Sequence, residues 1–401
     1  MNVTIRPGIA RGTVAAPPSK SMAHRLLICA ALAEGESIVR GVDRSEDILA
    51  TADCLSAFGA LLSWEEGTVR VRGCDPRRAA SSVLRCRESG STLRFMIPLC
   101  LLSGSSMRLE GSETLLSRPL SVYEDLCRKQ NLMLAREPGG LKVQGQLLPG
   151  EFAVPGDISS QFVSGLLFAL PLLTQDSLIR LIPPVESRSY LNLTLQALNS
   201  AGIPAAWKGE NMLAVPGNAV YHAQDTAVEG DCSNAAFFEA LNCTCGEVTV
   251  TGLRADSLQG DRVYREYLTR LKAASPELDL ADCPDLAPVL FAAAALCRGA
   301  VFTGTRRLRF KESNRGAAMA QEMAKFGIRL QIEEDRITVP AGEIRTPSEP
   351  LDSHNDHRIA MALSLLCTCT GGIILGAEAV RKSFPDYWNR LSSLGIRIDL
   401  R

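Results

Sequence analysis

Apolar residues recur at helical spacing directly after short polar segments along much of the chain. After Ser159 and Ser160, for example, the apolar positions 162, 163, 166, 167 and 170 fall on one helical face. A Ser, Thr or Asp just before such a run is typical of a helix N-cap, whose side chain accepts a hydrogen bond from a backbone N–H group. Two apolar stretches, 162–173 and 289–297, are too short to span a bilayer, so they predict buried helices.

Short segments rich in Val, Ile, Thr and Arg alternate with these helices and predict β-strands. We expect strands at 37–40, 68–72, 107–110, 178–181, 247–251, 300–303, 328–332 and 372–375. Segments 14–21, 154–161 and 228–235 share one pattern, in which an extended stretch and a Pro, Gly or Asp turn lead into an apolar run. Strands and helices recur at roughly 60 to 75 residues, which indicates an α/β protein with about six copies of one unit.

The repeated polar helix starts suggest that the protein binds anions. The first four N–H groups of a helix have no internal partner, and the helix dipole places partial positive charge there, so such ends bind phosphate and carboxylate. Simple N-capping is the alternative, and it explains any single copy. Several copies with Lys, Arg or Gln beside the cap favour anion binding.

Length and charge limit the classes of function. A chain of 401 residues predicts two or three domains, and 46% hydrophobic with 22% charged residues is typical of a globular protein. Since 43 basic and 44 acidic residues nearly cancel, the composition argues against DNA or an anionic membrane as partner. No signal peptide is evident in residues 1–7, and the 13 Cys include no Cys-x-x-Cys, so we expect reduced thiols and a cytoplasmic location.

Six polar segments carry the candidate chemistry, at 18–25, 88–94, 159–161, 306–315, 353–358 and 381–387. In the first, Lys20 and Arg25 flank a helix start that leads into apolar residues. In the second, Gly90 lets backbone N–H groups approach a ligand closely. The fourth holds five cations and the carboxylate of Glu312, which should stay ionised or carry a proton.

Two other interpretations of these segments are weaker. A nucleic-acid patch at 306–315 would need a wider basic field and interleaved aromatic residues. The His-x-x-His spacing of His354 and His357 suggests a metal, but no third ligand stands at a recognised spacing, and Arg358 beside it would oppose a cation. We therefore expect no metal.

The ordered motifs Pro-Ser-Lys-Ser-x-x-x-Arg, Ser-Gly-Ser-Thr-x-Arg, Arg-Pro, Gly-Asp-Ile-Ser-Ser-Gln, Lys-Glu-Ser-Asn-Arg, Asn-Asp-His-Arg and Lys-Ser-Phe-Pro-Asp-Tyr run from about residue 14 to 390. In this order they resemble the 5-enolpyruvylshikimate-3-phosphate (EPSP) synthase family. The resemblance implies an α/β (α+β) fold of two domains, each made of three βαβαββ repeats, with helix ends pointing into the cleft between them. It places residues 1–18 and 230–401 in one domain and residues 19–229 in the other.

The resemblance also implies an activity. Members of the family transfer the enolpyruvyl group of phosphoenolpyruvate to the 5-hydroxyl of shikimate 3-phosphate and release phosphate, without a cofactor. It implies a monomer that binds small molecules and neither nucleic acid nor membrane. Glyphosate is implied as a competitor of phosphoenolpyruvate, because Gly90 leaves room beside the phosphate.

Site residues follow from matching positions. The implied catalytic residues are Lys20, Asp285, Glu312 and Lys382. The implied shikimate 3-phosphate site contains Lys20, Ser21, Arg25, Ser159, Ser160, Gln161, Ser187, Tyr190, Asp285 and Lys311. The implied phosphoenolpyruvate site contains Lys20, Gly90, Arg118, Gln161, Arg315, His357, Arg358 and Lys382. Glu88, Ser89, Arg307 and Gly316 depart from the residues that many relatives have.

Two alternatives remain at this point. The sister enzyme that transfers enolpyruvyl to a UDP-amino sugar resembles this chain in fold, but it has Lys-Asn where this chain has Lys20-Ser21, and it uses a mobile-loop Cys that we do not locate here. An anion-binding scaffold built on the same repeat would not need Asp285 and Glu312 among its cations.

Overall fold

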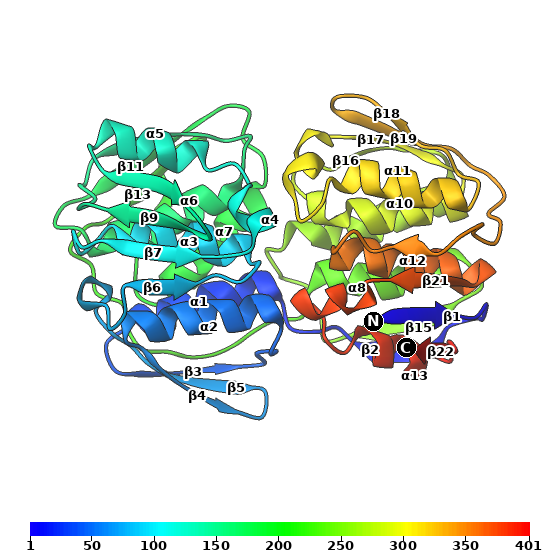
Figure 1. Ribbon diagram of the computed structural model, residues 1–401, viewed down its shortest axis with the longest axis horizontal. Helices are drawn as coiled ribbons and strands as arrows, with labels where there is room; N and C mark the ends of the chain where they lie inside the picture. The colour runs from blue at the N-terminus through cyan, green and yellow to red at the C-terminus, as the bar shows by residue number, and fades with distance from the viewer. The chain divides into compact units, whose positions relative to one another are not determined.

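The computed structural model describes residues 1–401, and the chain divides into two compact units. Unit 1 contains Met1–Pro17 and Gly230–Arg401, and unit 2 contains Pro18–Glu229. The chain therefore starts in unit 1, builds the whole of unit 2, and returns. In Figure 1 the blue-to-green segments form unit 2, and the green-to-red segments together with the first blue strands form unit 1.

Unit 2 holds three four-stranded sheets built to one plan, with strand orders β14-β3-β5-β4, β6-β7-β9-β8 and β10-β11-β13-β12. In each sheet the first two strands are parallel and the other pairings are antiparallel. The strands are β3 (Glu36–Arg40), β4 (Leu61–Glu65), β5 (Thr68–Arg72), β6 (Val83–Arg85), β7 (Met107–Glu110), β8 (Met133–Glu137), β9 (Gly140–Gln144), β10 (Glu151–Pro155), β11 (Ser177–Ile182), β12 (Ala206–Trp207), β13 (Met212–Val215) and β14 (Asp225–Ala227). The last strand of the unit completes the sheet of the first.

Three helices of unit 2 are almost wholly buried, namely α1 (Lys20–Leu32), α3 (Gly90–Cys100) and α6 (Ser160–Ala169). Beyond their first two turns they are apolar on all sides, so they must be covered all round. The other helices are α2 (Glu46–Phe58), α4 (Glu113–Leu116), α5 (Ser121–Lys129), α7 (Arg188–Ser200) and the short 3-10 helices η1 (Pro76–Arg78) and η2 (Leu170–Leu172). The polar groups of the three central helices are therefore concentrated in their first two turns.

Unit 1 repeats this plan with the strand orders β20-β21-β1-β22, β16-β17-β19-β18 and β15-β2. Its strands are β1 (Asn2–Ile5), β2 (Arg11–Ala15), β15 (Glu247–Thr251), β16 (Glu277–Asp279), β17 (Ala300–Thr303), β18 (Gln331–Ile332), β19 (Arg336–Val339), β20 (Leu351–Asp352), β21 (Gly372–Leu375) and β22 (Ile398–Leu400). Its buried central helices are α8 (Cys232–Glu239), α10 (Ala287–Leu296) and α12 (His357–Thr370). The remaining helices are α9 (Tyr264–Ala273), α11 (Arg315–Lys325), α13 (Tyr387–Ser393), η3 (Ala240–Cys243), η4 (Gly260–Val263), η5 (Pro284–Leu286), η6 (Arg306–Phe310) and η7 (Ala377–Lys382).

The predicted α/β class is confirmed, with two local differences. The strand expected at 328–332 covers only Gln331–Ile332, because Gly327 turns the chain at a φ of +89° and the Ile328 N–H bonds back to Met323. The third sheet of unit 1 has two strands instead of four. Only three residues separate α9 from β16, so no further hairpin fits there.

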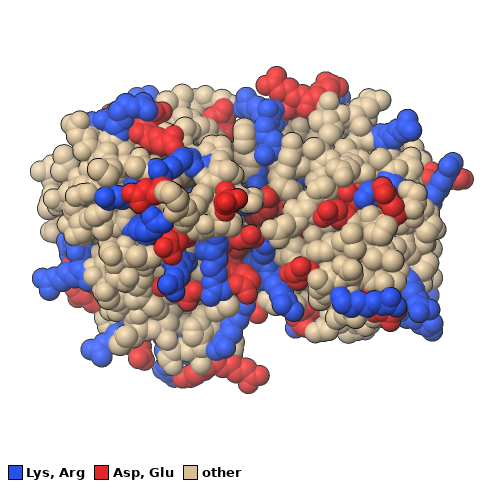
Figure 2. All heavy atoms as spheres, in the orientation of Figure 1, with Lys and Arg blue, Asp and Glu red and all other residues tan.

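Other structural features bear on the predicted setting of the protein. All 13 cysteines are free thiols. No helix combines the length and the apolar character that crossing a membrane requires. On the face shown in Figure 2, basic and acidic side chains are interspersed over each unit. This mixture agrees with the nearly balanced charge of the sequence.

Candidate active site

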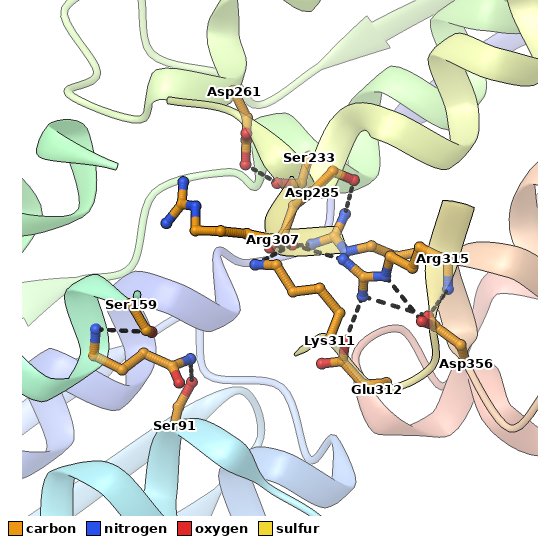
Figure 3. Close-up of polar contacts among 12 residues, drawn as sticks. Ser91, Ser159, Ser233, Asp261, Asp285, Arg307, Lys311, Glu312, Arg315 and Asp356 are labelled. Atoms are coloured by element: carbon orange, nitrogen blue, oxygen red, sulfur yellow. Dashed lines mark hydrogen bonds and ion pairs between the residues drawn. The ribbon is translucent and has the colours of Figure 1, made fainter. Parts of the chain in front are cut away.

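The central helices of unit 2 begin at serine caps. Ser19 accepts a hydrogen bond from the Met22 N–H group at the start of α1, and Ser89 accepts one from the Thr92 N–H group at the start of α3. Ser159 does the same for Gln161 at the start of α6 (Figure 3). Each serine satisfies only one of the four unpaired N–H groups of its helix, so the others point at the same polar region.

Lys20 is the first residue of α1, and its ammonium group pairs with a carboxylate of α2. The Lys20 Nζ lies 2.7 Å from Asp47 Oδ2, and the two side chains are 13% and 12% exposed. This contact holds the ammonium group close to the start of α1. Because both groups remain in reach of solvent, an anion that approaches the helix start can share the cation.

Arg25 is buried one turn further along α1. Its guanidinium donates to Thr194 Oγ1 at 2.8 Å, to Ser21 O at 2.6 Å and to Tyr190 O at 3.1 Å. Burial lowers the pKa of Arg25 to about 10, so the group stays charged at neutral pH. Arg25 therefore ties α1 to α7 beside Tyr190, while Lys20 is directed toward α2.

The start of α3 brings Gly90 against two guanidinium groups. A Cβ atom on Gly90 would lie 2.7 Å from Arg118 Nη1 and 3.3 Å from Arg94 Nη1. Arg94 donates to Gln161 Oε1 at 2.6 Å. Gln161 Nε2 donates to Ser91 Oγ at 2.9 Å (Figure 3). The side-chain amide of Gln161 is thereby oriented with its NH₂ group toward the start of α3.

A chain of buried hydroxyls lies behind these helix starts. Thr51 Oγ1 is 2.7 Å from His24 Nδ1 and 2.7 Å from Thr92 Oγ1, and Thr92 Oγ1 donates to Ser89 Oγ at 2.8 Å. Burial, with smaller contributions from Lys20 and Arg25, lowers the pKa of His24 well below its usual value, so the ring is neutral at pH 7. The chain links α1, α2 and α3 through uncharged groups.

The remaining predicted residues of unit 2 lie near the ends of α6 and α7. Ser160 is the first residue of α6 and is partly exposed. Ser187 precedes α7 with a left-handed φ of 56°, and Tyr190 stands in the first turn of that helix. We call Lys20, Gly90, Arg94, Arg118 and Gln161 the helix-start cluster.

Unit 1 gathers its charged residues around Arg315, the first residue of α11, whose side chain is 1% exposed. Its Nε donates to Asp356 Oδ2 at 2.8 Å, its Nη1 to Asp285 Oδ1 at 2.7 Å and its Nη2 to Glu312 Oε2 at 2.5 Å (Figure 3). Burial opposes the charge, but the three carboxylates, led by Asp356, raise the pKa of Arg315 well above its usual value.

Asp285 is shared by three cations. Besides Arg315, Lys311 Nζ lies 3.2 Å from Asp285 Oδ1, and Arg358 Nη2 donates to Asp285 Oδ2 at 3.2 Å. Burial alone would raise the pKa of Asp285, but Arg358, Lys311 and Arg315 together hold it well below its usual value. Burial lowers the pKa of Lys311, and Asp285 partly offsets this effect. The Asp285 carboxylate is therefore ionised at neutral pH.

The start of α12 completes this arrangement. Asp356 caps the helix through the Arg358 N–H group and also accepts from Arg315 and from Ser313. His357 is buried at 1% exposure in the first turn. Lys382, at the end of η7, donates from Nζ to the Asn355 carbonyl at 2.7 Å. We call Asp285, Lys311, Glu312, Arg315, Asp356 and Arg358 the ion-pair cluster.

The sequence profile of the EPSP synthase (3-phosphoshikimate 1-carboxyvinyltransferase) family matches residues 6–391. The chain belongs to this family. A protein of Clostridium kluyveri named 3-phosphoshikimate 1-carboxyvinyltransferase is 37% identical over 418 residues, which cover 99% of this chain and 98% of that protein. A protein of the same name from Clostridioides difficile is 35% identical over 429 residues, covering 99% and 98%.

Solved structures give the same fold. An EPSP synthase from Acinetobacter baumannii aligns with a TM-score of 0.79 at 24% sequence identity, and the alignment covers 100% of both chains. At this identity the likeness establishes the shared fold, which is the two-domain fold expected from the EPSP synthase resemblance.

Reasoning from sequence missed residues that hold the expected ones in place. Asp47 pairs with Lys20, Arg94 orients Gln161, and Asp356 fixes Arg315. Asp356 and Arg94 lie in the polar segments 353–358 and 88–94, but neither is among the site residues expected from the sequence. Asp47 had no signal beyond its place in the first turn of a helix, because its partner is 27 residues away.

The ion-pair cluster is also more acidic than expected. The run 306–315 contains one carboxylate, Glu312, among five cations. In the fold, Asp285 and Asp356 join it from other elements. Among the residues that the structure describes, which are all 401, no group of three or more His, Cys, Asp or Glu is arranged to hold a metal ion.

Proposed function

We propose that this chain catalyses the transfer of the enolpyruvyl group of phosphoenolpyruvate to the 5-hydroxyl of shikimate 3-phosphate, with release of phosphate (EC 2.5.1.19). The family match across residues 6–391 carries the proposal. The two clusters supply what the reaction needs, because both substrates are anions and negative charge develops on the departing phosphate.

The proposed division of roles follows the resemblance. Ser21, Arg25, Ser159, Ser160, Ser187, Tyr190 and Lys311 bind shikimate 3-phosphate, Gly90, Arg118, Arg315, His357 and Arg358 bind phosphoenolpyruvate, and Lys20 and Gln161 contact both. Lys20, Asp285, Glu312 and Lys382 carry protons or stabilise the charges that form. Arg94 orients the Gln161 amide, so we add it as a positioning residue.

The chemistry has two steps. The 5-hydroxyl adds to C2 of phosphoenolpyruvate while the methylene carbon takes a proton, which gives a tetrahedral intermediate. The intermediate then loses phosphate, and its methyl group returns a proton, so that the enol ether forms. Cations placed in advance around both phosphates stabilise the charge as it moves.

Asp285 is the proposed base for the 5-hydroxyl, but three cations hold its pKa down when no ligand is bound. A carboxylate that interacts so strongly with cations is a weak base. Substrate anions that attract Arg358, Lys311 and Arg315 would reduce this effect and raise the basicity of Asp285. We therefore propose that substrate binding itself activates the base.

The decisive experiment mixes the purified protein with phosphoenolpyruvate and shikimate 3-phosphate and follows free phosphate. We expect release only when both substrates are present, and mass spectrometry should show the enolpyruvyl adduct. UDP-N-acetylglucosamine as the acceptor in a parallel reaction tests the sister activity, which the family match does not favour. Binding of both anions without phosphate release would favour the scaffold alternative and contradict the proposal.

A cytoplasmic location and a monomeric state stay predictions. The 13 free thiols support the first, since a reducing compartment keeps cysteines unpaired. Gel filtration of the purified protein at micromolar concentration tests the second.

A further inference from the structure

Glu322 is a fully buried carboxylate on α11 that belongs to neither cluster. Its side chain is 0% exposed, and its Oε2 accepts a hydrogen bond from the Asp352 N–H group at 2.9 Å. Its Oε1 lies 3.1 Å from His354 Nε2, and Lys325 Nζ lies 2.8 Å from Oε2. Removing a partner from a buried carboxylate leaves polar groups unsatisfied and lowers the stability of the fold. Glu322 therefore restrains the groups that it contacts.

It holds the loop that connects β20 to α12. In this loop His354 and Asn355 have φ values of 50° and 52°, two consecutive left-handed positions without glycine. Such positions are strained and persist only where the surroundings impose them. Here Glu322 contacts His354 and the Asp352 N–H group, and the His354 N–H group donates to Asp352 Oδ1 at 2.7 Å.

The same loop presents the groups that the reaction uses. The carbonyl of Asn355 accepts from Lys382 Nζ at 2.7 Å, so the backbone conformation of the loop sets the position of that ammonium group. Asp356 follows at once, capping α12 and pairing with Arg315. Arg315 and Glu322 are seven residues apart, two turns along one face of α11, so one helix holds the loop at two points.

We propose that the Glu322–His354 contact is a positioning device that sets Lys382 and the first turn of α12 for the handling of phosphoenolpyruvate. Glu322 and His354 need not touch the substrate; they act through the Asn355 carbonyl. The role assigned to Lys382 rests on the proposed function, whereas the mechanical link from Glu322 to Lys382 does not.

The test compares three variants that differ at this contact. His354→Phe removes the ring nitrogen that contacts Glu322, His354→Gln supplies an amide donor instead, and Lys325→Met removes another partner of Glu322 without touching the loop. We expect His354→Phe to lower kcat/KM for phosphoenolpyruvate about 10- to 100-fold while KM for shikimate 3-phosphate changes little. His354→Gln should recover most of the loss. Lys325→Met leaves the buried Glu322 carboxylate without its ammonium partner, so it should lower stability, but it keeps the His354 contact and should keep kcat/KM close to wild type.

A second readout does not depend on turnover. Acylation of Lys382 by an amine-reactive ester, followed by peptide mass spectrometry and normalised to the exposed Lys129, reports how firmly Nζ is held. Labelling of Lys382 in the ligand-free protein should be several-fold faster in His354→Phe than in wild type, and unchanged in His354→Gln and Lys325→Met.

Thermal melts show which variants fold. If His354→Phe does not fold, Glu322→Gln replaces it, because glutamine keeps an acceptor for the Asp352 N–H group. Equal labelling and equal kcat/KM in His354→Phe, His354→Gln and wild type would overturn the inference. A wild-type protein without phosphate release overturns the proposed function instead, and the labelling comparison then still decides whether Glu322 and His354 position Lys382.

Discussion

The two units place similar functional groups at similar helix starts but neutralise them differently. In unit 2 the helix starts are linked by neutral hydroxyls and amides, and Lys20 has one carboxylate, Asp47, beside it. In unit 1 Arg315 alone contacts three carboxylates, and Asp285 contacts three cations. One repeat has therefore been used to build a site in which cations lie among neutral donors and a site rich in ion pairs.

The difference suggests different roles for the two units. In the helix-start cluster Arg94 contacts the neutral amide of Gln161, and the Lys20 ammonium group stays close to the start of α1, so this cluster can receive an anion with little rearrangement. The ion-pair cluster must redistribute its contacts before its cations reach a ligand, and the same redistribution changes the basicity of Asp285. We expect substitutions in unit 1 to alter pH dependence, and those in unit 2 to alter mainly affinity and rate.

The largest effect is expected for Asp285→Asn. Loss of the proposed base should lower kcat by about 10²–10⁴, the range typical of a general base. The three cations around residue 285 also lose their shared anion, so the free energy of unfolding at pH 7 should fall by about 3 kcal/mol. Phosphate-release kinetics and urea unfolding measure the two effects, and an Asp285→Asn variant with wild-type kcat would remove Asp285 from the mechanism.

The pH dependence of stability sharpens this prediction. Because cations lower the pKa of Asp285 in the folded state, its stabilising effect is complete above the pKa of an unfolded aspartate, about 3.9, and is lost as pH falls through the lower folded value. The stability gap between wild type and Asp285→Asn should therefore be constant from pH 7 to about pH 5 and shrink below pH 4. A gap that persists unchanged at pH 3 would contradict the assigned ion pairs.

Lys20→Met should come next, with kcat/KM lowered by about 10²–10³ for the loss of one charge that stabilises the transition state. Since Lys20 and Asp47 are only 13% and 12% exposed, the variant leaves a largely buried carboxylate without its cation, so the melting temperature should fall while the protein still folds. Asp47→Asn is the matched variant, which keeps the cation and should lose less activity. Near-normal turnover of Lys20→Met would refute its role.

Gly90→Ala should have a moderate effect. The added methyl group would meet Arg118 Nη1 at 2.7 Å, so the guanidinium, the flexible end of a long side chain, must shift. We expect KM for phosphoenolpyruvate to rise about 10- to 100-fold with little change in stability, since a displacement of about 1 Å has effects of this size. Gly8→Ala, where a Cβ atom would meet only ordinary van der Waals contacts, the nearest at 3.5 Å, is a control for the substitution itself. An unchanged KM for phosphoenolpyruvate in Gly90→Ala would show that Arg118 does not bind this substrate.

The smallest effect on activity is expected for Thr51→Val, which interrupts the buried hydroxyl chain behind the helix-start cluster. His24 and Thr92 each lose a partner, so the free energy of unfolding should fall by about 1–3 kcal/mol. Thr51→Ser keeps the hydroxyl and should retain the hydrogen bonds. Kinetic constants should stay close to wild type in both variants, and a large loss of kcat in Thr51→Val alone would show that this chain does more than support the fold.

Local pattern predicted much of the fold, because a cap and the apolar run behind it are neighbours in sequence. Ser159 caps a helix as expected, and the strands at 68–72, 107–110, 247–251, 300–303 and 372–375 have the expected bounds. The strand expected at 328–332 was wrong in part because the Ile328 N–H group bonds back to Met323 in the last turn of α11. Burial of Ile328 satisfies the same pattern as a strand.

The partners of the charged residues were beyond the reach of sequence pattern. Lys20 and Asp47 are 27 residues apart, Arg315 and Asp356 are 41 apart, and Arg358 and Asp285 are 73 apart. Such pairs depend on how the repeats pack against one another, and no short-range pattern in a single sequence shows this packing. The resemblance to EPSP synthases named most of the expected residues, whereas the structure shows which acid neutralises which base.

Unit 2 is inserted into unit 1 as a single uninterrupted segment, and the two ends of the insertion are close together on the unit 1 side. The Asp231 N–H group donates to Pro17 O at 2.8 Å, so residues 17 and 230 are already neighbours. A gene that joins codon 17 to codon 230 would encode unit 1 with an almost unstrained junction, and codons 18–229 alone would encode unit 2. The two halves of this protein are thus separable at the level of DNA, which would allow the ion-pair cluster to be titrated by NMR in a polypeptide of half the size.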